Sequence, residues 1–105
     1  MEYGVVRITQ ANLDHSHLYL ADVFDMFPID AIGGSSIVDR APRLLEIHCG
    51  IEGKIITDIA GDKKIFRKRG WVREFFAVHD IQAGSAVVIE NTGGDRYHIY
   101  PIRLT

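Results

Sequence analysis

The clearest chemical feature of this sequence is a group of basic side chains crowded into one short stretch. Residues 61–73 hold half of the chain's twelve lysines and arginines: Lys63, Lys64, Arg67, Lys68, Arg69 and Arg73. Asp62 is the single acid among them, so the stretch carries a formal charge of +5 while the whole chain carries −2. A concentrated basic patch on an acidic body is typical of a surface that binds phosphates. A solvated charged turn is the alternative interpretation.

A second polar cluster occupies residues 10–17. Its members are Gln10, Asn12, Asp14, His15, Ser16 and His17. Asn and Gln can pair with adenine, and Asp can accept a hydrogen bond from cytosine N4. On an extended segment His15 and His17 would face the same way, which suits a metal site, but no third ligand is apparent nearby. Contact with DNA or plain exposure is the preferred interpretation of the two histidines.

The sequence lacks a recognisable catalytic motif, and we expect no enzymatic activity. Asp30 and Glu46 could imitate a nuclease acid pair, but Glu46-Ile47-His48 lacks the lysine that a common nuclease motif places there. Gly33-Gly34-Ser35-Ser36 lacks the lysine and spacing of a P-loop, so it predicts a turn with an incidental backbone contact to phosphate. We expect no cofactor and no bound metal.

Length and composition predict one soluble domain over residues 1–105. Hydrophobic residues make up 47% of the chain and charged residues 25%, which is typical of a globular protein. A single cysteine, Cys49, allows no disulfide within the chain and permits a reducing compartment. No apolar run approaches the ~18 residues of a membrane span, and the sequence from Met1 to Gly4 does not resemble a signal peptide. We therefore expect a cytoplasmic protein without membrane contact.

Short β-prone segments separated by turn residues predict a mainly β fold. Strands are expected at Tyr3–Thr9, His17–Leu20, Arg43–His48, Lys54–Ile59, Lys63–Arg67, Ala86–Glu90 and Arg96–Arg103. Two of them form a hairpin through Ala60-Gly61-Asp62. Alternation along its second strand places Lys63, Arg67 and Arg69 on one side and Lys64 on the other. Pro101 indicates an edge position for the last strand.

Two short helices complete the expected fold. Apolar spacing predicts one at Ala21–Phe27, ended by Pro28, and one at Trp71–His79. Because strands and helices do not alternate, a parallel sheet is not expected. A small antiparallel barrel that hides its strand edges is the better solution.

Residues 65–90 resemble the B3 DNA-binding domain of plant transcription factors. The matching segments are Ile65-Phe66-Arg67-Lys68-Arg69-Gly70-Trp71-Val72-Arg73-Glu74-Phe75-Phe76 and Ile81–Glu90. In that family a Gly-Trp pair opens a helix, two apolar residues follow, and a small residue and Gly-Asp precede a short apolar strand. Ser85 stands here where the family usually has Asp. Ile8–Leu13 and Leu18–Pro28 are similar more loosely to the family's opening strand, second strand and first helix.

The resemblance implies a seven-stranded open pseudobarrel with two short helices and two arms that grip the DNA major groove. The same fold occurs in DNA-recognition domains of some bacterial restriction endonucleases. The arms correspond to Gln10–His17 and Ala60–Arg69, so Asp62 and Lys68 join the candidate DNA-binding residues. Arg67 or Arg69 is expected to read a base, and Lys63 and Lys64 to contact phosphate. Trp71 packs inside in this family, whereas stacking on a base is the alternative.

These observations predict sequence-selective binding of double-stranded DNA without catalysis. The chain would be the recognition module of a restriction-modification system or a transcription regulator. It would act by occupying its site or together with a nuclease or regulatory protein partner. The alternative is a small β-barrel that binds a protein or a small ligand instead of DNA, and the net charge of −2 favours it.

Overall fold

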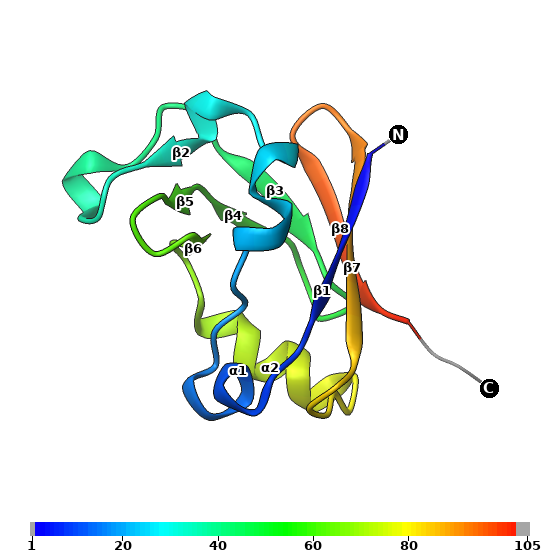
Figure 1. The fold of residues 1–105 in the computed structure, drawn as a ribbon. Helices are drawn as coiled ribbons and strands as arrows, with labels where there is room; N and C mark the ends of the chain where they lie inside the picture. Colours follow the sequence, from blue (N-terminus) through cyan, green and yellow to red (C-terminus); the bar gives the residue numbers. More distant parts are fainter. Residues whose placement is uncertain (1, 103–105) are drawn as a thin grey trace.

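Two open β-sheets form the body of the protein, which a computed structural model describes over residues 2–102 (Figure 1). The larger sheet has the order β1-β7-β8-β3-β4, and the smaller has the order β2-β5-β6. The strands are β1 (Tyr3–Arg7), β2 (Ile32–Gly33), β3 (Leu45–His48), β4 (Ile55–Thr57), β5 (Ile59–Ala60), β6 (Ile65–Phe66), β7 (Ala86–Gly93) and β8 (Arg96–Pro101). The predicted mainly β, open pseudobarrel is confirmed, with eight strands over residues 2–102 where seven were expected.

The helices are short. They are α1 (Gln10–His15), α2 (Gly70–Val78) and the 3-10 turns η1 (Ala21–Met26), η2 (Ile29–Ala31) and η3 (Ile37–Asp39). Helix α2 confirms the predicted helix, with both ends one residue earlier than expected. Its buried face is formed by Trp71, Val72, Phe75 and Phe76. The expected helix at Ala21–Phe27 is the 3-10 turn η1. No helix in the described residues is long and apolar enough to span a membrane.

The predicted strand at His17–Leu20 is wrong. Tyr19 makes a single antiparallel bridge to Ile65, and the backbone N–H of Leu20 donates to the Lys64 carbonyl at 2.8 Å. The segment cannot form a longer ladder because its partner β6 has only two residues. It nevertheless lies directly against the basic hairpin, which matters for the site.

The expected hairpin is present, but its first strand is divided between the sheets. β4 pairs with β3 in the larger sheet, whereas β5 pairs with β6 in the smaller one. The chain changes sheets at Asp58, which lies between β4 and β5. The turn of the hairpin takes up residues 61–64, so Lys63 and Lys64 lie in the turn and not in a strand.

Two strand pairs are parallel, so the expectation of a purely antiparallel barrel is wrong. β3 runs parallel to β8, and β2 runs parallel to β5. The expected edge position of the last strand is also wrong, because β8 lies between β7 and β3. Pro101 fits there since β3 is short and pairs only with residues 96–98, which leaves the proline without a partner on that side. Arg103, the expected end of the last strand, lies outside the described residues.

The core lies between the two sheets and α2. An aromatic chain runs through it, with ring centroids 5.2 Å apart for Phe27 and Tyr97, 5.9 Å for Phe27 and Phe66, and 5.8 Å for Phe66 and Trp71. Trp71 is buried and its indole N–H donates to the Lys68 carbonyl. This burial agrees with the expected packing role of Trp71 and leaves no face for stacking on a base. The core therefore fixes the start of α2 and the residues just before it.

Candidate nucleic-acid interface

The two segments expected to be arms lie next to each other. Residues 17–20, after α1, run beside β6 and are held by the Tyr19–Ile65 bridge and the Leu20–Lys64 hydrogen bond (Figure 1). His17 and Arg69 line one small hollow between the segments. Residues more than forty positions apart in sequence are thus brought to one surface.

The hairpin separates Lys63 and Lys64 onto different sides, but through its turn and not through the expected alternation of a strand. Lys63, Arg67 and Arg69 line one hollow of about 150 Å³ together with Ser35, and Lys64 is not among its residues. The Lys64 ammonium lies 5.3 Å from the centre of the Phe24 ring, a cation–π distance that directs it toward η1. Lys63 and Arg69 are therefore the exposed cations on the side of the hollow, and Lys64 is directed elsewhere.

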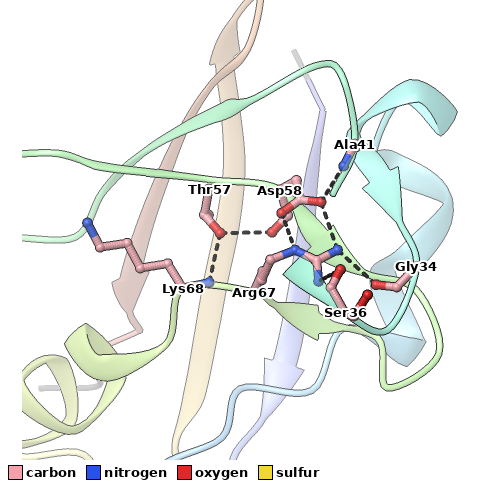
Figure 2. A network of polar contacts seen from close by, with 7 residues as sticks. All are labelled: Gly34, Ser36, Ala41, Thr57, Asp58, Arg67 and Lys68. Carbon is pink, nitrogen blue, oxygen red and sulfur yellow. Dashed lines mark hydrogen bonds and ion pairs between the residues drawn. The ribbon is translucent and has the colours of Figure 1, made fainter. Parts of the chain in front are cut away.

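Arg67 is not free to read a base. Its Nε donates to Asp58 Oδ1 at 2.7 Å, and its Nη2 donates to Asp58 Oδ2 at 3.0 Å and to the Gly34 carbonyl at 2.8 Å (Figure 2). Its Nη1 donates to the Ser36 carbonyl at 3.0 Å. The Arg67 side chain is only 14% exposed, against 3% for Asp58. The sheet change at Asp58 places a carboxylate beneath this guanidinium, so of the two expected base readers, Arg67 and Arg69, the structure leaves the Arg69 guanidinium exposed.

Asp58 is the centre of this network. Its Oδ2 also accepts a hydrogen bond of 2.7 Å from the Ala41 backbone N–H. Burial by itself would raise the pKa of Asp58, but the hydrogen bonds from Arg67 and Ala41 outweigh it and the pKa is lowered. Asp58 is thus ionised at neutral pH and ties the hairpin to residues 34–41. A lone acid within the apolar run 55–60 is the sequence signal that could have revealed this pairing.

Residues 10–15, which belong to the expected first arm, form the helix α1, a helix that was not predicted from the sequence. Thr9 Oγ1 accepts from the Asn12 N–H at 3.2 Å, and Asn12 Oδ1 accepts from the Thr9 N–H at 2.7 Å. These reciprocal bonds form a capping box that starts the helix. Asn12 is only 3% exposed and belongs to the cap, so its expected contact with DNA would require the side chain to become exposed. Gln10 and Asp14 remain exposed, and Gln10 Nε2 donates to Asp14 Oδ1 at 3.0 Å.

His15, His17 and Tyr19 follow one another along the edge of the same surface. The ring centroids of His15 and His17 are 6.0 Å apart, and those of His17 and Tyr19 are 5.5 Å apart. Burial lowers the pKa of His17, and the positive charges of Arg69, His15 and Lys63 lower it further. Cations from both segments therefore act on one imidazole. Among residues 2–102, no three His, Cys, Asp or Glu side chains are grouped so that they could hold a metal ion.

The remaining candidates lie around this centre. Ser16 ends α1 with a left-handed φ of 53°, and Asp62 is exposed in the hairpin turn. Lys68 points away from Arg67 (Figure 2) and lines a different, more apolar hollow with Arg40 and Ile37. We use the name basic face for His15, His17, Lys63 and Arg69. Ser35 borders this face and was not expected there as a candidate, although its turn was considered as a phosphate contact.

The two acids that could imitate a nuclease pair are engaged in separate ion pairs. Asp30 binds Arg43 at 3.2 Å. Glu46 contacts His48 at 2.6 Å, Arg96 at 3.2 Å and Lys54 at 3.4 Å. The hydrogen bond with His48 is the main reason that the pKa of Glu46 falls to about 2.

No family model matches the chain, and no curated protein matches it. Among solved structures, the fold is similar to the N-terminal domain of Helicobacter pylori LlaJI.R1, with a TM-score of 0.61. The likeness covers 100% of this chain and 90% of that chain, at 10% sequence identity. At this identity the comparison shows a shared fold over the length of the chain.

Proposed function

We propose that this domain binds double-stranded DNA in a sequence-selective way through the basic face. The observation that carries the proposal is the pairing of the residues just after the first arm, Tyr19 and Leu20, with the second arm. The bridge from Tyr19 to Ile65 holds His17 beside Arg69, and Arg69 in turn shares a hollow with Lys63. Basic side chains brought to one place by backbone pairing form a preorganised site for a polyanion, since little loop ordering remains to be lost on binding.

The positions of the basic side chains give them different proposed roles in DNA binding, although each carries the same charge. Arg69 is the proposed base reader, because it is exposed and its guanidinium can pair bidentately with guanine O6 and N7. Lys63 is the proposed phosphate contact beside it. Gln10 and Asp14, an amide and a carboxylate on the exposed side of α1, are the proposed contacts to neighbouring bases. Lys64 contributes less, because its ammonium lies over Phe24.

The fold supports the same proposal. A B3-like domain uses two arms in the major groove, and the segments that correspond to those arms are the two that meet here. The similar domain comes from a component of a restriction system. We therefore propose a recognition module without its own catalysis. It acts by occupying its site or by directing a nuclease or a regulatory protein to it.

Selection from a random pool of short duplexes tests the proposal. We expect enrichment of a defined sequence and binding that weakens steeply between low and moderate salt. Fluorescence anisotropy with the selected duplex then compares Lys63→Ala with Lys54→Ala, which removes the same charge far from the basic face. Lys63→Ala should weaken binding to all duplexes and reduce the salt slope by about one unit. Lys54→Ala should leave both unchanged.

Arg69→Ala separates base reading from general attraction. We expect the preference at one base pair to relax by about 1–3 kcal/mol, with other positions unaffected. A uniform loss of affinity over all sequences would make Arg69 a phosphate contact instead. Failure to enrich any sequence, or equal effects of Lys63→Ala and Lys54→Ala, would remove the basis for the proposal.

A further inference from the structure

The loop between β2 and β3 projects on the same side of the molecule as the β5–β6 hairpin (Figure 1). We call residues 34–40 the η3 loop. Its base lies against the hairpin, because β2 pairs with β5 and the Gly61 N–H donates to the Gly33 carbonyl at 2.9 Å. An element in this place reaches the same ligand as the hairpin does.

The η3 loop is closed by its own hydrogen bonds. The Gly34 N–H donates to the Asp39 carbonyl at 2.9 Å, and the Asp39 N–H donates to the Ser36 carbonyl at 3.0 Å. The Arg67 guanidinium donates further hydrogen bonds to the carbonyls of Gly34 and Ser36. A Cβ added at Gly33 would lie 2.5 Å from the Asp39 carbonyl oxygen, so only glycine permits this close approach. The loop is therefore a built, preorganised element.

This stiff loop carries an apolar tip. Ile37 is 66% exposed and Val38 is 87% exposed. Ile37 and Val38 are adjacent at the tip, and such an exposed apolar pair indicates a binding surface. No contact inside the described residues explains why these two side chains face outward.

The surroundings of the tip identify the chemistry of its partner. On one side Ile37 borders the hollow that contains Lys63 and Arg69, and on the other it borders a hollow with Arg40 and Lys68. Asp39 is the acid of the loop, and its carboxylate accepts a hydrogen bond of 3.0 Å from Ser36. An apolar tip in which Ile37 has cations on both sides fits a ligand that presents apolar groups between phosphates. The major groove of DNA does so through the 5-methyl group of thymine.

We infer that the η3 loop is a third DNA-contacting element, in which Ile37 and Val38 contact a thymine 5-methyl group and Arg40 contacts the neighbouring phosphate. This inference rests on the proposed function and refines it, because it adds an apolar contribution to sequence preference. It also gives Arg67 a role in DNA binding that involves no contact with DNA. The guanidinium holds the loop against the hairpin, so the two move as one body.

Uracil scanning tests the inference, because replacing thymine by uracil removes only the 5-methyl group. With the wild-type protein and its selected duplex, each thymine is replaced in turn and the affinity is measured. We expect one or two replacements to weaken binding about fourfold, which corresponds to the burial of one methyl group. In the double variant Ile37→Ser, Val38→Ser, binding to the thymine duplex should weaken and the uracil penalty should disappear.

Ile29→Ser is the matched control, since Ile29 is 87% exposed and lines neither hollow at the tip. It should leave both the affinity and the uracil penalty unchanged. Thermal unfolding should be the same for all three proteins, because each altered side chain is exposed. Arg40→Ala should weaken binding to every duplex without changing the uracil penalty.

The outcomes separate this inference from the proposed function. If the wild-type protein selects a duplex but no uracil replacement matters, or the penalty persists in the double variant, the η3 loop does not contact thymine and the proposed function stands. Unchanged DNA affinity in the double variant would likewise overturn the inference, because the apolar tip would then contribute nothing to DNA binding. If the wild-type protein binds no duplex at all, the proposed function fails and this inference fails with it.

Discussion

Arg67 and Asp58 form a nearly buried ion pair with two parallel hydrogen bonds, from Nε to Oδ1 at 2.7 Å and from Nη2 to Oδ2 at 3.0 Å. The pair lies where the chain passes from one sheet to the other. The same guanidinium holds the carbonyls of Gly34 and Ser36. Arg67 therefore joins three parts of the chain that are distant in sequence, and its charge is neutralised inside the protein.

Replacing Arg67 should cost stability, whereas replacing Arg69 should not. We expect Arg67→Ala to lower the free energy of unfolding by about 3–5 kcal/mol, because it leaves the Asp58 carboxylate buried without its partner. Arg67→Lys should lose most of the same amount, since an ammonium cannot make the paired bonds. Arg69→Ala should change stability by less than about 0.5 kcal/mol. Urea unfolding followed by the fluorescence of Trp71 measures all three, and equal costs at both positions would contradict the assignment.

The capping box predicts that replacing Asn12 lowers the stability of the protein much more than replacing Gln10, a nearby residue of α1. Asn12→Ala removes the acceptor for the Thr9 N–H and should cost about 1 kcal/mol of unfolding free energy. Asn12→Asp keeps an acceptor at the same place and should restore most of it. Gln10→Ala, on the exposed side of α1, serves as the control and should be nearly neutral. Thermal unfolding distinguishes the three, and a neutral Asn12→Ala would show that the cap is dispensable.

The lowered pKa values of two carboxyl groups, Glu46 and Asp58, predict that the protein loses stability in acid. The pKa of Glu46 is lowered from 4.5 to about 2, chiefly by the hydrogen bond with His48, and the pKa of Asp58 is lowered from 3.8. A pKa that is lower in the folded state stabilises the fold above the unfolded pKa, and this stabilisation disappears as pH falls through the folded pKa. The melting temperature should therefore fall from about pH 4.5 toward pH 2. Glu46→Gln should make that decline shallower, and an unaltered decline would exclude Glu46 as a cause.

DNA affinity should increase as pH falls through the titration of His17. Burial and the nearby charges of Arg69, His15 and Lys63 lower the pKa of His17 below 6.5, so the imidazole is neutral at pH 7. Bound phosphate favours its protonation, and each protonated histidine adds a cation to the basic face. Protonation also costs folding stability, because the pKa is lower in the folded state than in the unfolded state.

His17→Gln should remove much of this pH dependence between pH 7 and pH 5.5 in anisotropy measurements. His79→Gln is a control outside the basic face, since His79 bonds to the Cys49 carbonyl. Its affinity should keep the wild-type dependence on pH. A pH profile that is identical for the wild type and His17→Gln would contradict the placement of His17 at the DNA.

The parts of the fold that could be predicted depend on local patterns. Gly61 and Asp62 between β-prone runs indicate the hairpin, and the spacing of Trp71 and Phe75 indicates α2. The start of α1 was missed because its capping box uses Asn12 where Glu or Gln is usual. Parallel pairing of β3 with β8 joins Glu46 to Arg96, and no local pattern reports a contact over that distance.

The candidate site was predicted as a region but not residue by residue. The charge density of residues 61–73 located the hairpin correctly, since exposure of a charged turn follows from its sequence alone. Arg67 is engaged inside the protein because the fold brings Asp58 and the carbonyls of Gly34 and Ser36 to its guanidinium. These partners are distant in sequence, so no local pattern predicts them. Lys63 and Lys64 are adjacent and alike in sequence, yet one borders Arg69 and the other lies over Phe24.

The pairing of β1 with β7 has a consequence for how the protein is made. Tyr3 pairs with Glu90 and Arg7 with Ala86, so β1 leaves the ribosome long before the strand with which it pairs. Until β7 emerges, β1 is an unpaired strand with exposed backbone groups, a state in which chains associate with one another. Because so many contacts join distant residues, folding should be slow for a chain of this size. Brief protection of the nascent N-terminal segment by a chaperone would therefore benefit this protein more than a helical domain of equal length.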